Sequence, residues 1–236
     1  KLLNRHTSSK NKNLMIDDFN NNKIDILIGT HSIFNKDINF KNTGLVVIDE
    51  EHKFGIRQKN IIKSNQENIH ILYLSATPIP RTMNFIFAGL KDFSFLQTPP
   101  QNRLSIKSFL KVNSEQLFKE AINREISRGG QTFIIQNDIS KIDKLSIYIK
   151  KLLPDSRIRI AHGKLKKQDI TDAMTHFNNG NIDILICTTI VEMGLDIPNA
   201  NTILIIDSHK LGLSQLHQLR GRIGRSNRQG YCYFFI

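Results

Sequence analysis

Cysteine and long apolar runs are scarce in this sequence, and several common motifs are missing. The 236 residues include two cysteines, Cys187 and Cys232, and neither stands at a CxxC or Cys/His ligand spacing. A disulfide framework and a zinc site are therefore poorly supported, and a reducing compartment, the cytoplasm, is expected. No apolar run approaches the roughly 20 residues of a membrane span, which excludes an integral membrane protein. No signal-peptide pattern opens the chain, and no HExxH pair supports a metalloprotease.

Acidic residues are the minority charge. Aspartate and glutamate number 21 against 33 lysines and arginines, which gives a net charge of +12 and a pI near 9.8. This balance indicates a polyanionic partner or ligand, although it does not separate DNA, RNA and nucleotide. Hydrophobic residues make up 39% of the chain, enough for a folded core, and the length allows one or two domains.

An internal repeat divides the chain. The run Ile24–Thr30 recurs as Ile182–Thr188, and Leu45–Asp49 recurs at the same offset as Ile203–Asp207. Coincidence in an isoleucine-rich chain is the alternative, but two matches at one offset with matched polar ends disfavour it. The runs are short, continuous and β-branched, which is typical of buried parallel strands whose carboxyl ends carry function.

Segments with helical character alternate with these strands; examples are residues 114–128, 141–153 and 167–178. Alternation of this kind predicts an α/β fold with parallel sheets, here as two lobes of one doubly wound type. We expect the first lobe over residues 1–97, a linker over 98–105 and the second lobe over 106–236, because Pro99 and Pro100 stop regular structure.

The second lobe contains strands that the first lobe lacks. The counterpart of the strand Thr132–Ile135 would fall before Lys1, so we expect a first lobe truncated at its N-terminus. In nucleotide-binding α/β lobes that strand leads into the phosphate loop, and no G-x-x-x-x-G-K-[ST] occurs in these residues. Because the chain begins with Lys1 rather than Met, it is expected to be an internal piece of a longer protein and inactive alone.

Adjacent carboxylates end the first repeated pair of strands. Val46–Glu50 has the form of a Walker B strand, in which Asp49 can hold hydrated Mg²⁺ and Glu50 can orient the attacking water. An ordinary strand with an acidic turn is the alternative, and the motif is weak by itself. Ser75 and Thr77 follow another apolar strand, Ile69–Leu74, where a Ser/Thr turn before proline is the alternative.

Arginines interleaved with glycine form the most specific pattern, Gln218–Arg225. The guanidinium groups of Arg222 and Arg225 are suited to stabilise charge on a γ-phosphate. A solvated basic loop or a plain nucleic-acid backbone contact is the alternative. The segment Thr188–Asp196 follows a repeated strand, and its hydroxyls and amides suit phosphate contacts. Gly194 permits close backbone approach there, with a structural turn as the alternative.

In this order the motifs resemble a superfamily 2 helicase motor. The resembling segments are Gly29–His31 (motif Ib or Ic), Asp49–His52 (motif II), Ser75–Thr77 (motif III), Thr188–Asp196 (motif V) and Gln218–Arg225 (motif VI). The segments Asp49–Lys59, Ala76–Thr82 and Leu211–Gln218 are similar to the signature of the RecG and Mfd group. Glu51 and Thr98–Lys107 favour the Mfd branch, the bacterial transcription-repair coupling factors, and RecG is the alternative.

The resemblance implies two tandem RecA-like lobes with ATP and Mg²⁺ between them. It implies that Asp49 holds Mg²⁺ through water, that Glu50 positions the water, and that Arg222 and Arg225, with Gln218, reach the γ-phosphate. The remaining implied roles are coupling for His52, Ser75 and Thr77, linkage of ATP to DNA for Gly194 and Asp196, and DNA-backbone contact for Thr30, His31, His162, Gly163, Thr188 and Thr189.

The function implied for the whole protein is translocation on double-stranded DNA and displacement of stalled RNA polymerase. Polymerase and the excision-repair damage-recognition protein would bind through regions that these residues do not include. Two alternatives stay open. One is a RecG-like helicase of branched DNA, and the other is a degraded DNA-binding remnant without ATPase activity.

Overall fold

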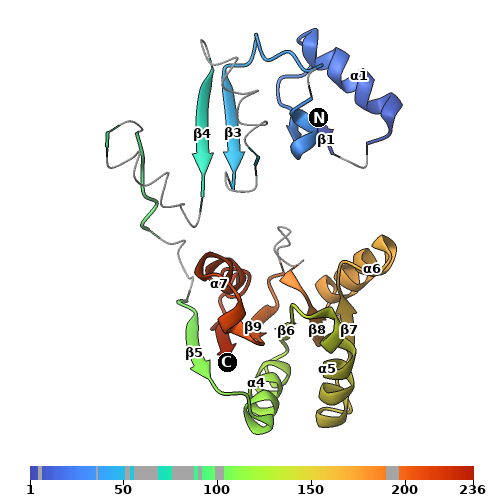
Figure 1. Cartoon of the computed structure of the whole chain (residues 1–236), viewed down its shortest axis with the longest axis vertical. Helices are drawn as coiled ribbons and strands as arrows, with labels where there is room; N and C mark the ends of the chain where they lie inside the picture. The colour runs from blue at the N-terminus through green and yellow to red at the C-terminus, as the bar shows by residue number, and fades with distance from the viewer. Residues whose placement is uncertain are drawn as a thin grey trace. The chain divides into compact units, whose positions relative to one another are not determined.

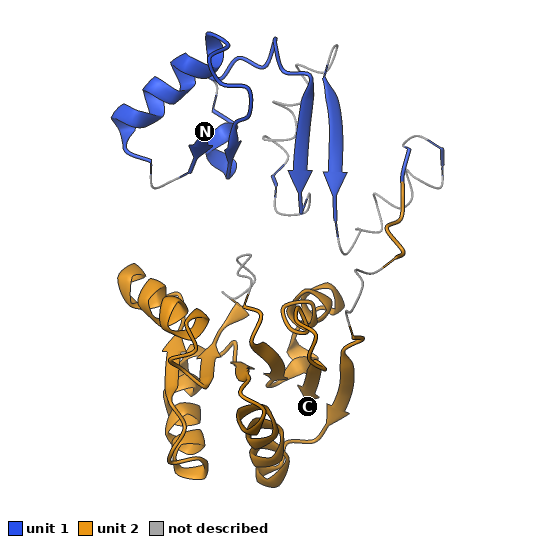
Figure 2. Cartoon of the chain, turned by 180° about the vertical axis from the view of Figure 1, so that it is seen from behind, with its two compact units in different colours: residues 1–93 blue, residues 94–236 orange. Residues whose placement is uncertain are grey.

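The computed structural model describes residues 1–4, 7–35, 37–50, 54–55, 69–75, 88–89, 92–98, 104–189 and 197–236. The chain divides into two compact units, Lys1–Phe93 and Ser94–Ile236, coloured separately in Figure 2. Every hydrogen-bonded strand pair among the described residues is parallel, which confirms the predicted α/β class. The linker expected at 98–105 stays a prediction, because residues 99–103 lie outside the described ranges.

The second unit is built on a six-stranded sheet with the strand order β5-β10-β9-β6-β8-β7 (Figure 1). Its strands are β5 (Lys107–Lys111), β6 (Gln131–Ile135), β7 (Ile158–Ala161), β8 (Ile184–Cys187), β9 (Ala200–Ile205) and β10 (Tyr231–Phe235). Its helices are α4 (Glu115–Ser127), α5 (Ile139–Leu152), α6 (Lys167–Asn178), α7 (Leu213–Arg220) and the 3-10 helix η5 (Ser208–Lys210). After β6 the chain adds β7 and β8 on one side of β6, and then crosses to add β9 and β10 on the other side. The direction of winding therefore changes between β6 and β9. Ligands of open α/β sheets bind at the carboxyl ends of strands at such a point.

The central strands of this sheet are covered by helices on both faces. β6, β8 and β9 are buried at every position. Phe133 packs in one core cluster with Phe177 of α6, and the next residue, Ile134, packs in the other with Phe118 of α4. Burial on both faces explains why these strands read as continuous apolar runs rather than as alternating ones.

The three predicted helices of the second unit are present, and side-chain caps set where two of them begin. Ser114 Oγ accepts a hydrogen bond from the Leu117 N–H at 3.3 Å ahead of α4. Asp138 Oδ1 accepts one from the Ser140 N–H at 3.0 Å ahead of α5, which therefore begins two residues before the predicted range. Among the described residues, no helix is long and apolar enough to cross a membrane.

The first unit contains two separate pairs of strands. The elements are β1 (Leu2–Leu3), α1 (Ser9–Asn20), β2 (Ile28–Gly29), the 3-10 helix η1 (His31–Ile33), β3 (Leu45–Asp49) and β4 (His70–Leu74). The predicted strand over Ile24–Thr30 is too long. Within this run the strand covers Ile28–Gly29, which pairs in parallel with Leu2–Leu3.

The β3–β4 pair has one buried and one exposed face. Ile48 is buried, with 4% of its surface exposed, whereas Val47 is 52% and Leu72 is 48% exposed. Leu45 and Leu74 lie on the same face and are also exposed. The first unit thus presents an apolar sheet face to its surroundings, unlike the second unit, where β6, β8 and β9 are covered on both faces.

Candidate functional site

The carboxyl ends of β3 and β4 bring three predicted site residues to one edge of the first unit. Asp49 is the last residue of β3 and pairs in register with Leu74 of β4. Glu50 donates its N–H to the Leu74 carbonyl at 3.0 Å, and Ser75 is the next residue along β4's chain. The two strands therefore fix the backbones of Asp49, Glu50 and Ser75 as neighbours, as their position after apolar runs predicts.

Glu50 has a left-handed backbone with φ 55°. Such a conformation costs a non-glycine residue about 1–3 kcal/mol and is concentrated at functional turns. The hydrogen bond from its N–H to Leu74 helps to hold this turn. The carboxylate of Glu50 is thus carried by a strained turn directly after Asp49, which is the arrangement expected of a residue that must point away from its strand.

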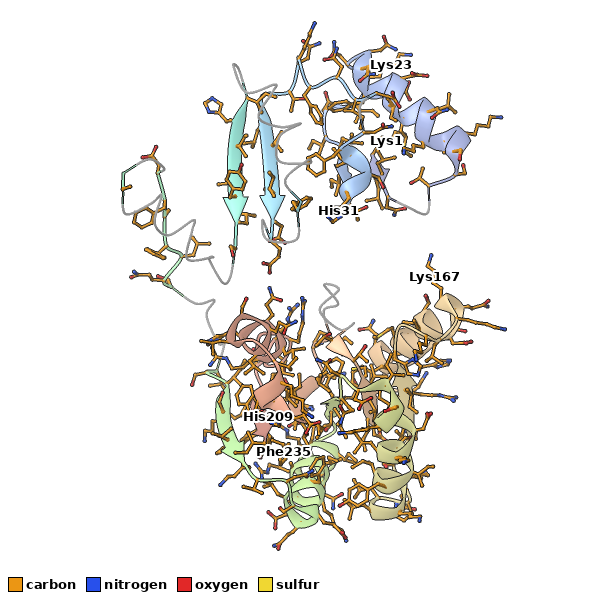
Figure 3. The ribbon with its side chains drawn as sticks, viewed as in Figure 1. Lys1, Lys23, His31, Lys167, His209 and Phe235 are labelled. Carbon is orange, nitrogen blue, oxygen red and sulfur yellow. The ribbon has the colours of Figure 1, made fainter. Side chains whose placement is uncertain are left out.

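His31 joins this edge through an aromatic contact. Its ring stacks on Phe54 with centroids 4.8 Å apart, and Phe34 meets Phe54 edge-on at 5.4 Å. Figure 3 shows His31 on the side of the first unit to which the β3 and β4 arrows point. Thr30 donates its N–H to the Leu3 carbonyl at 3.3 Å, so the end of β2 is also tied to β1.

In the second unit, residues after β6, β7 and β8 meet at the carboxyl edge of the sheet. The Thr189 N–H donates to Asn137 Oδ1 at 3.2 Å, and the Thr188 N–H reaches the Ala161 carbonyl at 3.4 Å. His162 follows Ala161, is 8% exposed, and its Nδ1 has no hydrogen-bond partner among the described residues. Gly163 follows His162, and the described surroundings leave open space where its side chain would be.

Asn137 is a site residue that the sequence patterns did not single out. It stands two residues after the end of β6, a polar residue at a strand end like Thr188 after β8. That position was the available signal, but Asn137 belongs to none of the quoted motifs. Its side chain holds the amide of Thr189, and so links two adjacent strand ends.

The arginine loop, residues 221–230, follows α7 and contains Arg222 and Arg225. Leu219 and Ile223 are fully buried in the core and fix the base of the loop. The Arg222 N–H donates to the Leu219 carbonyl at 3.0 Å, while Arg225 Nε donates to the Gly221 carbonyl at 3.3 Å. Arg222 is partly buried and Arg225 is exposed. Buried residues therefore fix the base of the loop, which carries one partly buried and one exposed arginine.

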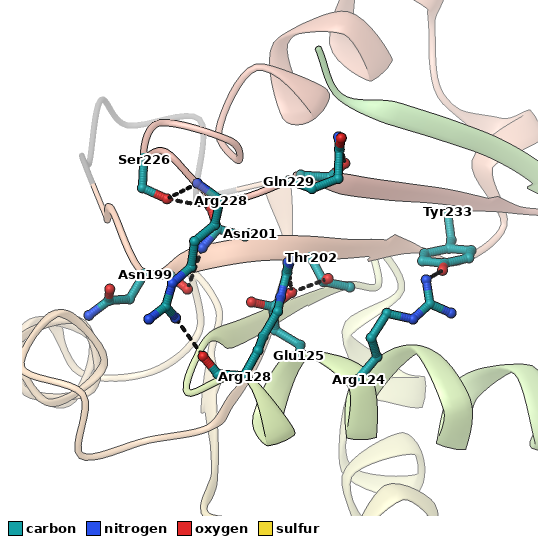
Figure 4. A network of polar contacts seen from close by, with 11 residues as sticks. Arg124, Glu125, Arg128, Asn199, Asn201, Thr202, Ser226, Arg228, Gln229 and Tyr233 are labelled. Atoms are coloured by element: carbon teal, nitrogen blue, oxygen red, sulfur yellow. Dashed lines mark hydrogen bonds and ion pairs between the residues drawn. The ribbon is translucent and has the colours of Figure 1, made fainter. Parts of the chain in front are cut away.

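The far end of the arginine loop is held by a polar network (Figure 4). Ser226 Oγ donates to Asn201 Oδ1 at 3.0 Å, and Arg228 Nη1 donates to the Arg128 carbonyl at 2.8 Å. Arg128 also forms an ion pair with Glu125, which is fully buried and accepts a hydrogen bond from Thr202 Oγ1. The network ties the loop to α4 and β9.

Asp207, which like Glu50 and Asn22 has a left-handed backbone, marks the switch point between β6 and β9. It has φ 51°, and Lys210 and Lys141 lie 3.0 and 3.5 Å from its carboxylate. The hydrogen bond from Lys210 holds the pKa of Asp207 below its ordinary value. A cavity of about 280 Å³ opens here, lined by Gln136, Asn137, Asp138, Ile206, Asp207, Lys210 and Leu211.

Not every predicted residue can be placed. His52, Thr77, Gly194 and Asp196 lie outside the described residues. The described residues contain no group of three or more His, Cys, Asp or Glu side chains that could hold a metal. The carboxylate of Asp49 nevertheless suits Mg²⁺, which binds through one or two carboxylates and keeps several waters. The chemical roles of all predicted site residues stay predictions.

Comparison with known proteins gives matches along the chain. The family model "DEAD/DEAH box helicase" matches residues 1–86, and "Helicase conserved C-terminal domain" matches residues 113–227. The transcription-repair-coupling factor of Buchnera aphidicola subsp. Baizongia pistaciae is 45% identical over 235 residues, 100% of this chain and 34% of the relative. That of Escherichia coli is 44% identical over 232 residues, 98% of this chain and 20% of the relative.

A solved structure is similar over the whole chain. The structure of RecG bound to a three-way DNA junction has 34% sequence identity and a TM-score of 0.71, and covers 100% of this chain and 31% of RecG. The chain thus spans about a third or less of the length of these relatives. Together with the two helicase models, the similarity confirms two tandem RecA-like lobes.

Proposed function

Because the chain belongs to the superfamily 2 helicases, in the group of RecG and the transcription-repair-coupling factors, we propose that it is the motor part of a double-stranded DNA translocase. ATP hydrolysis drives this motor, and its task is transcription-coupled nucleotide excision repair. The observation that carries the proposal is the division of charge between the two units. Asp49 and Glu50 stand at a strand end in one unit, and the arginine loop with Arg222 and Arg225 stands in the other.

In this proposal the two units contribute opposite charges to one reaction. Asp49 would hold Mg²⁺ through water, and the bound ion would supply positive charge that neutralises the phosphates. Glu50 orients the attacking water and accepts its proton. Arg222 and Arg225 donate to the γ-phosphate oxygens, where charge is concentrated, and Gln218 supports them from α7.

In this proposal the residues that follow β2, β7 and β8 contact the DNA backbone. Thr188 and Thr189 present hydroxyls and amides of the kind that bind backbone phosphates, and Asn137 holds one of these amides in place. His162 and Gly163 extend this edge, because β7 lies next to β8. Thr30 and His31 serve the same purpose in the first unit. Backbone contacts of this type carry no sequence preference. The net charge of +12 adds attraction to the phosphates, and this part of the binding weakens with salt.

The partners proposed for the whole protein follow from the resemblance to the transcription-repair-coupling factors. We propose RNA polymerase and a damage-recognition protein of excision repair. We assign their binding to regions outside these residues.

RecG is the specific alternative, since the RecG structure covers the whole chain at 34% identity. A RecG-like motor would remodel a branched DNA substrate without polymerase, whereas a coupling factor would displace a stalled polymerase. Comparing the two substrates with the same protein separates these functions. A DNA-binding remnant without ATPase activity is the third alternative.

The deciding experiment measures ATP hydrolysis with and without duplex DNA. It compares residues 1–236 with the same chain extended upstream through the phosphate loop. We expect DNA-stimulated hydrolysis only in the extended protein and its loss in Glu50→Gln. Hydrolysis by residues 1–236 alone would contradict the placement of the phosphate site, and none in either form would favour the remnant.

A further inference from the structure

The segment that enters the second unit lies directly against the arginine loop. Gln229 Nε2 donates a hydrogen bond to the Ser105 carbonyl at 2.5 Å, although the two residues are far apart in sequence. The Lys107 N–H donates to the Gly230 carbonyl at 3.0 Å, which begins the pairing of β5 with β10. The entry segment, Ser105–Lys107, is therefore bound to the end of the arginine loop by backbone and side-chain groups.

Ile106 fills the space beside two glycines of that loop. A Cβ on Gly224 would come within 3.0 Å of Ile106 Cγ1, and a Cβ on Gly230 within 3.2 Å of the same atom. Gly224 also has φ 65°, which side chains rarely adopt, so its backbone favours glycine. Ile106 thus packs against the backbone at Gly224 within the loop and at Gly230 at its end.

The same side chain reaches the buried anchor of the loop. Ile106 packs against the core cluster that contains Leu219 and Ile223. Arg222 lies between these two anchors in sequence, and Arg225 follows Gly224. Both guanidinium groups are therefore carried by a loop that contacts Ile106 and is anchored in the core cluster against which Ile106 packs.

We propose that Ile106 and Gln229 are positioning residues for Arg222 and Arg225. They fix the arginine loop to the segment through which the chain from the first unit enters the second. The reach of the two guanidinium groups then depends on the placement of this entry segment. The inference rests on the proposed function, because it assigns Arg222 and Arg225 to the γ-phosphate.

The test uses the upstream-extended protein and measures kcat and KM for ATP with saturating duplex DNA. Misplacement of a reacting group by about 1 Å can cost about 100-fold in rate. We expect Ile106→Ala to lower kcat roughly tenfold or more, with a KM for ATP within about twofold of the unmodified protein. Ile106→Val, which keeps the β-branch, is expected to restore most of the rate.

Ile158→Ala is the matched control. Ile106 and Ile158 are both partly buried isoleucines: Ile106 directly precedes β5, and Ile158 begins β7, the edge strand on the opposite side of the sheet. Both changes remove the same atoms and weaken the core, but Ile158 packs in the other cluster, away from the arginine loop. Equal loss of kcat in the two variants would overturn the proposal, since it would reduce the effect to general destabilisation.

Amide hydrogen exchange of residues 221–226 supplies a readout that does not need hydrolysis. Ile106→Ala and Gln229→Ala are expected to speed exchange there, whereas Ile158→Ala is not. Faster exchange without loss of kcat would mean that the contact holds the loop but does not position the arginines. If the unmodified extended protein lacks DNA-stimulated hydrolysis, the proposed function fails and the reaction role falls with it. Unchanged exchange in Ile106→Ala overturns the positional claim independently.

Discussion

The two units share one turn and use it differently. After β3 the chain turns left-handed at Glu50, with φ 55°, and after β9 it does so at Asp207, with φ 51°. The carboxylate of Asp207 lies 3.0 Å from Lys210, whereas Glu50 follows a second carboxylate, Asp49. The same left-handed turn therefore follows a strand in both units. In the first unit it carries one of two adjacent carboxylates, and in the second it carries a carboxylate that forms ion pairs with lysines.

Burial differs between the units as well. The central strands of the second unit are covered on both faces, while the β3–β4 pair exposes Val47 and Leu72. Apolar burial is the main favourable term in folding. The second unit therefore holds most of the described core.

The largest effect is expected when an arginine of the second unit is removed and the ATP hydrolysis assigned to the carboxylates of the first unit is measured. Arg222→Ala is expected to lower DNA-stimulated kcat by about 1,000-fold, because an arginine supplied to the γ-phosphate is worth that much or more. Arg159→Ala removes the same charge at an exposed position of β7, outside the arginine loop, and serves as the control. A loss as large in Arg159→Ala would point to net charge rather than to an arginine acting on the γ-phosphate.

Glu50 and Asp207 both have a left-handed backbone, and neutralising each carboxylate in turn tests whether only Glu50 takes part in hydrolysis. Glu50→Gln is expected to lower kcat by about 100-fold, the lower range for general base catalysis. Asp207→Asn removes the same charge at the matching turn and is expected to change kcat less than about threefold, because its carboxylate is bound by Lys210 and Lys141. Steady-state hydrolysis with duplex DNA measures both, and comparable losses would contradict the division of roles.

The internal repeat predicted the fold class but not the exact ends of the strands. It predicted parallel α/β lobes, and the helical character of residues 114–128 and 167–178 predicted α4 and α6 closely. The repeat aligns Asp49 with Asp207, whereas the backbone turns match Glu50 with Asp207, one position away. The offset between the repeats cannot show where a strand stops pairing. For this reason the predicted strand Ile24–Thr30 is longer than β2, which pairs with β1 only at Ile28–Gly29.

Contacts between distant segments were beyond the patterns. Nothing in the local sequence predicts that Gln229 binds the Ser105 carbonyl or that Ile106 lies against Gly224. Asn137 was missed for a similar reason, since its bond to Thr189 depends on β6 and β8 being neighbours. A motif predicts the chemistry at the end of one strand, whereas the order of strands in the sheet determines which strand ends lie next to each other.

Core substitutions extend the comparison to stability. Phe177→Ala, in the fully buried core of the second unit, is expected to lower the free energy of unfolding by about 3–5 kcal/mol. Val47→Ala, on the exposed face of β3, is expected to change it by less than about 0.5 kcal/mol. Urea unfolding of residues 1–236, followed by circular dichroism, measures both values. A large effect of Val47→Ala would show that its face is covered in solution.

The smallest expected difference lies in two ion pairs, one in each unit. Arg157 Nη2 lies 2.5 Å from Asp183 Oδ1 in the second unit, whereas Lys23 Nζ is 3.8 Å from Asp18 Oδ1 in the first. Burial alone would raise the pKa of Asp183, but the hydrogen bonds from Arg157 outweigh it and hold this pKa below 3.8. A carboxylate with a lowered pKa stabilises the fold above its unfolded-state pKa, and this stability is lost as the pH falls through the folded-state pKa.

Asp183→Asn is therefore expected to destabilise the chain by up to about 1 kcal/mol at pH 7, the range for exposed ion pairs. The difference should stay constant down to about pH 5 and shrink below about pH 4, where the unfolded carboxylate takes up its proton. Asp18→Asn, in a longer and more exposed pair, is expected to have no measurable effect at either pH. Urea unfolding of both variants at pH 7 and pH 3 compares them. Because Asp183 also accepts the Arg157 N–H at 2.8 Å, a difference that persisted at pH 3 would show that backbone geometry, and not charge, makes this pair stabilising.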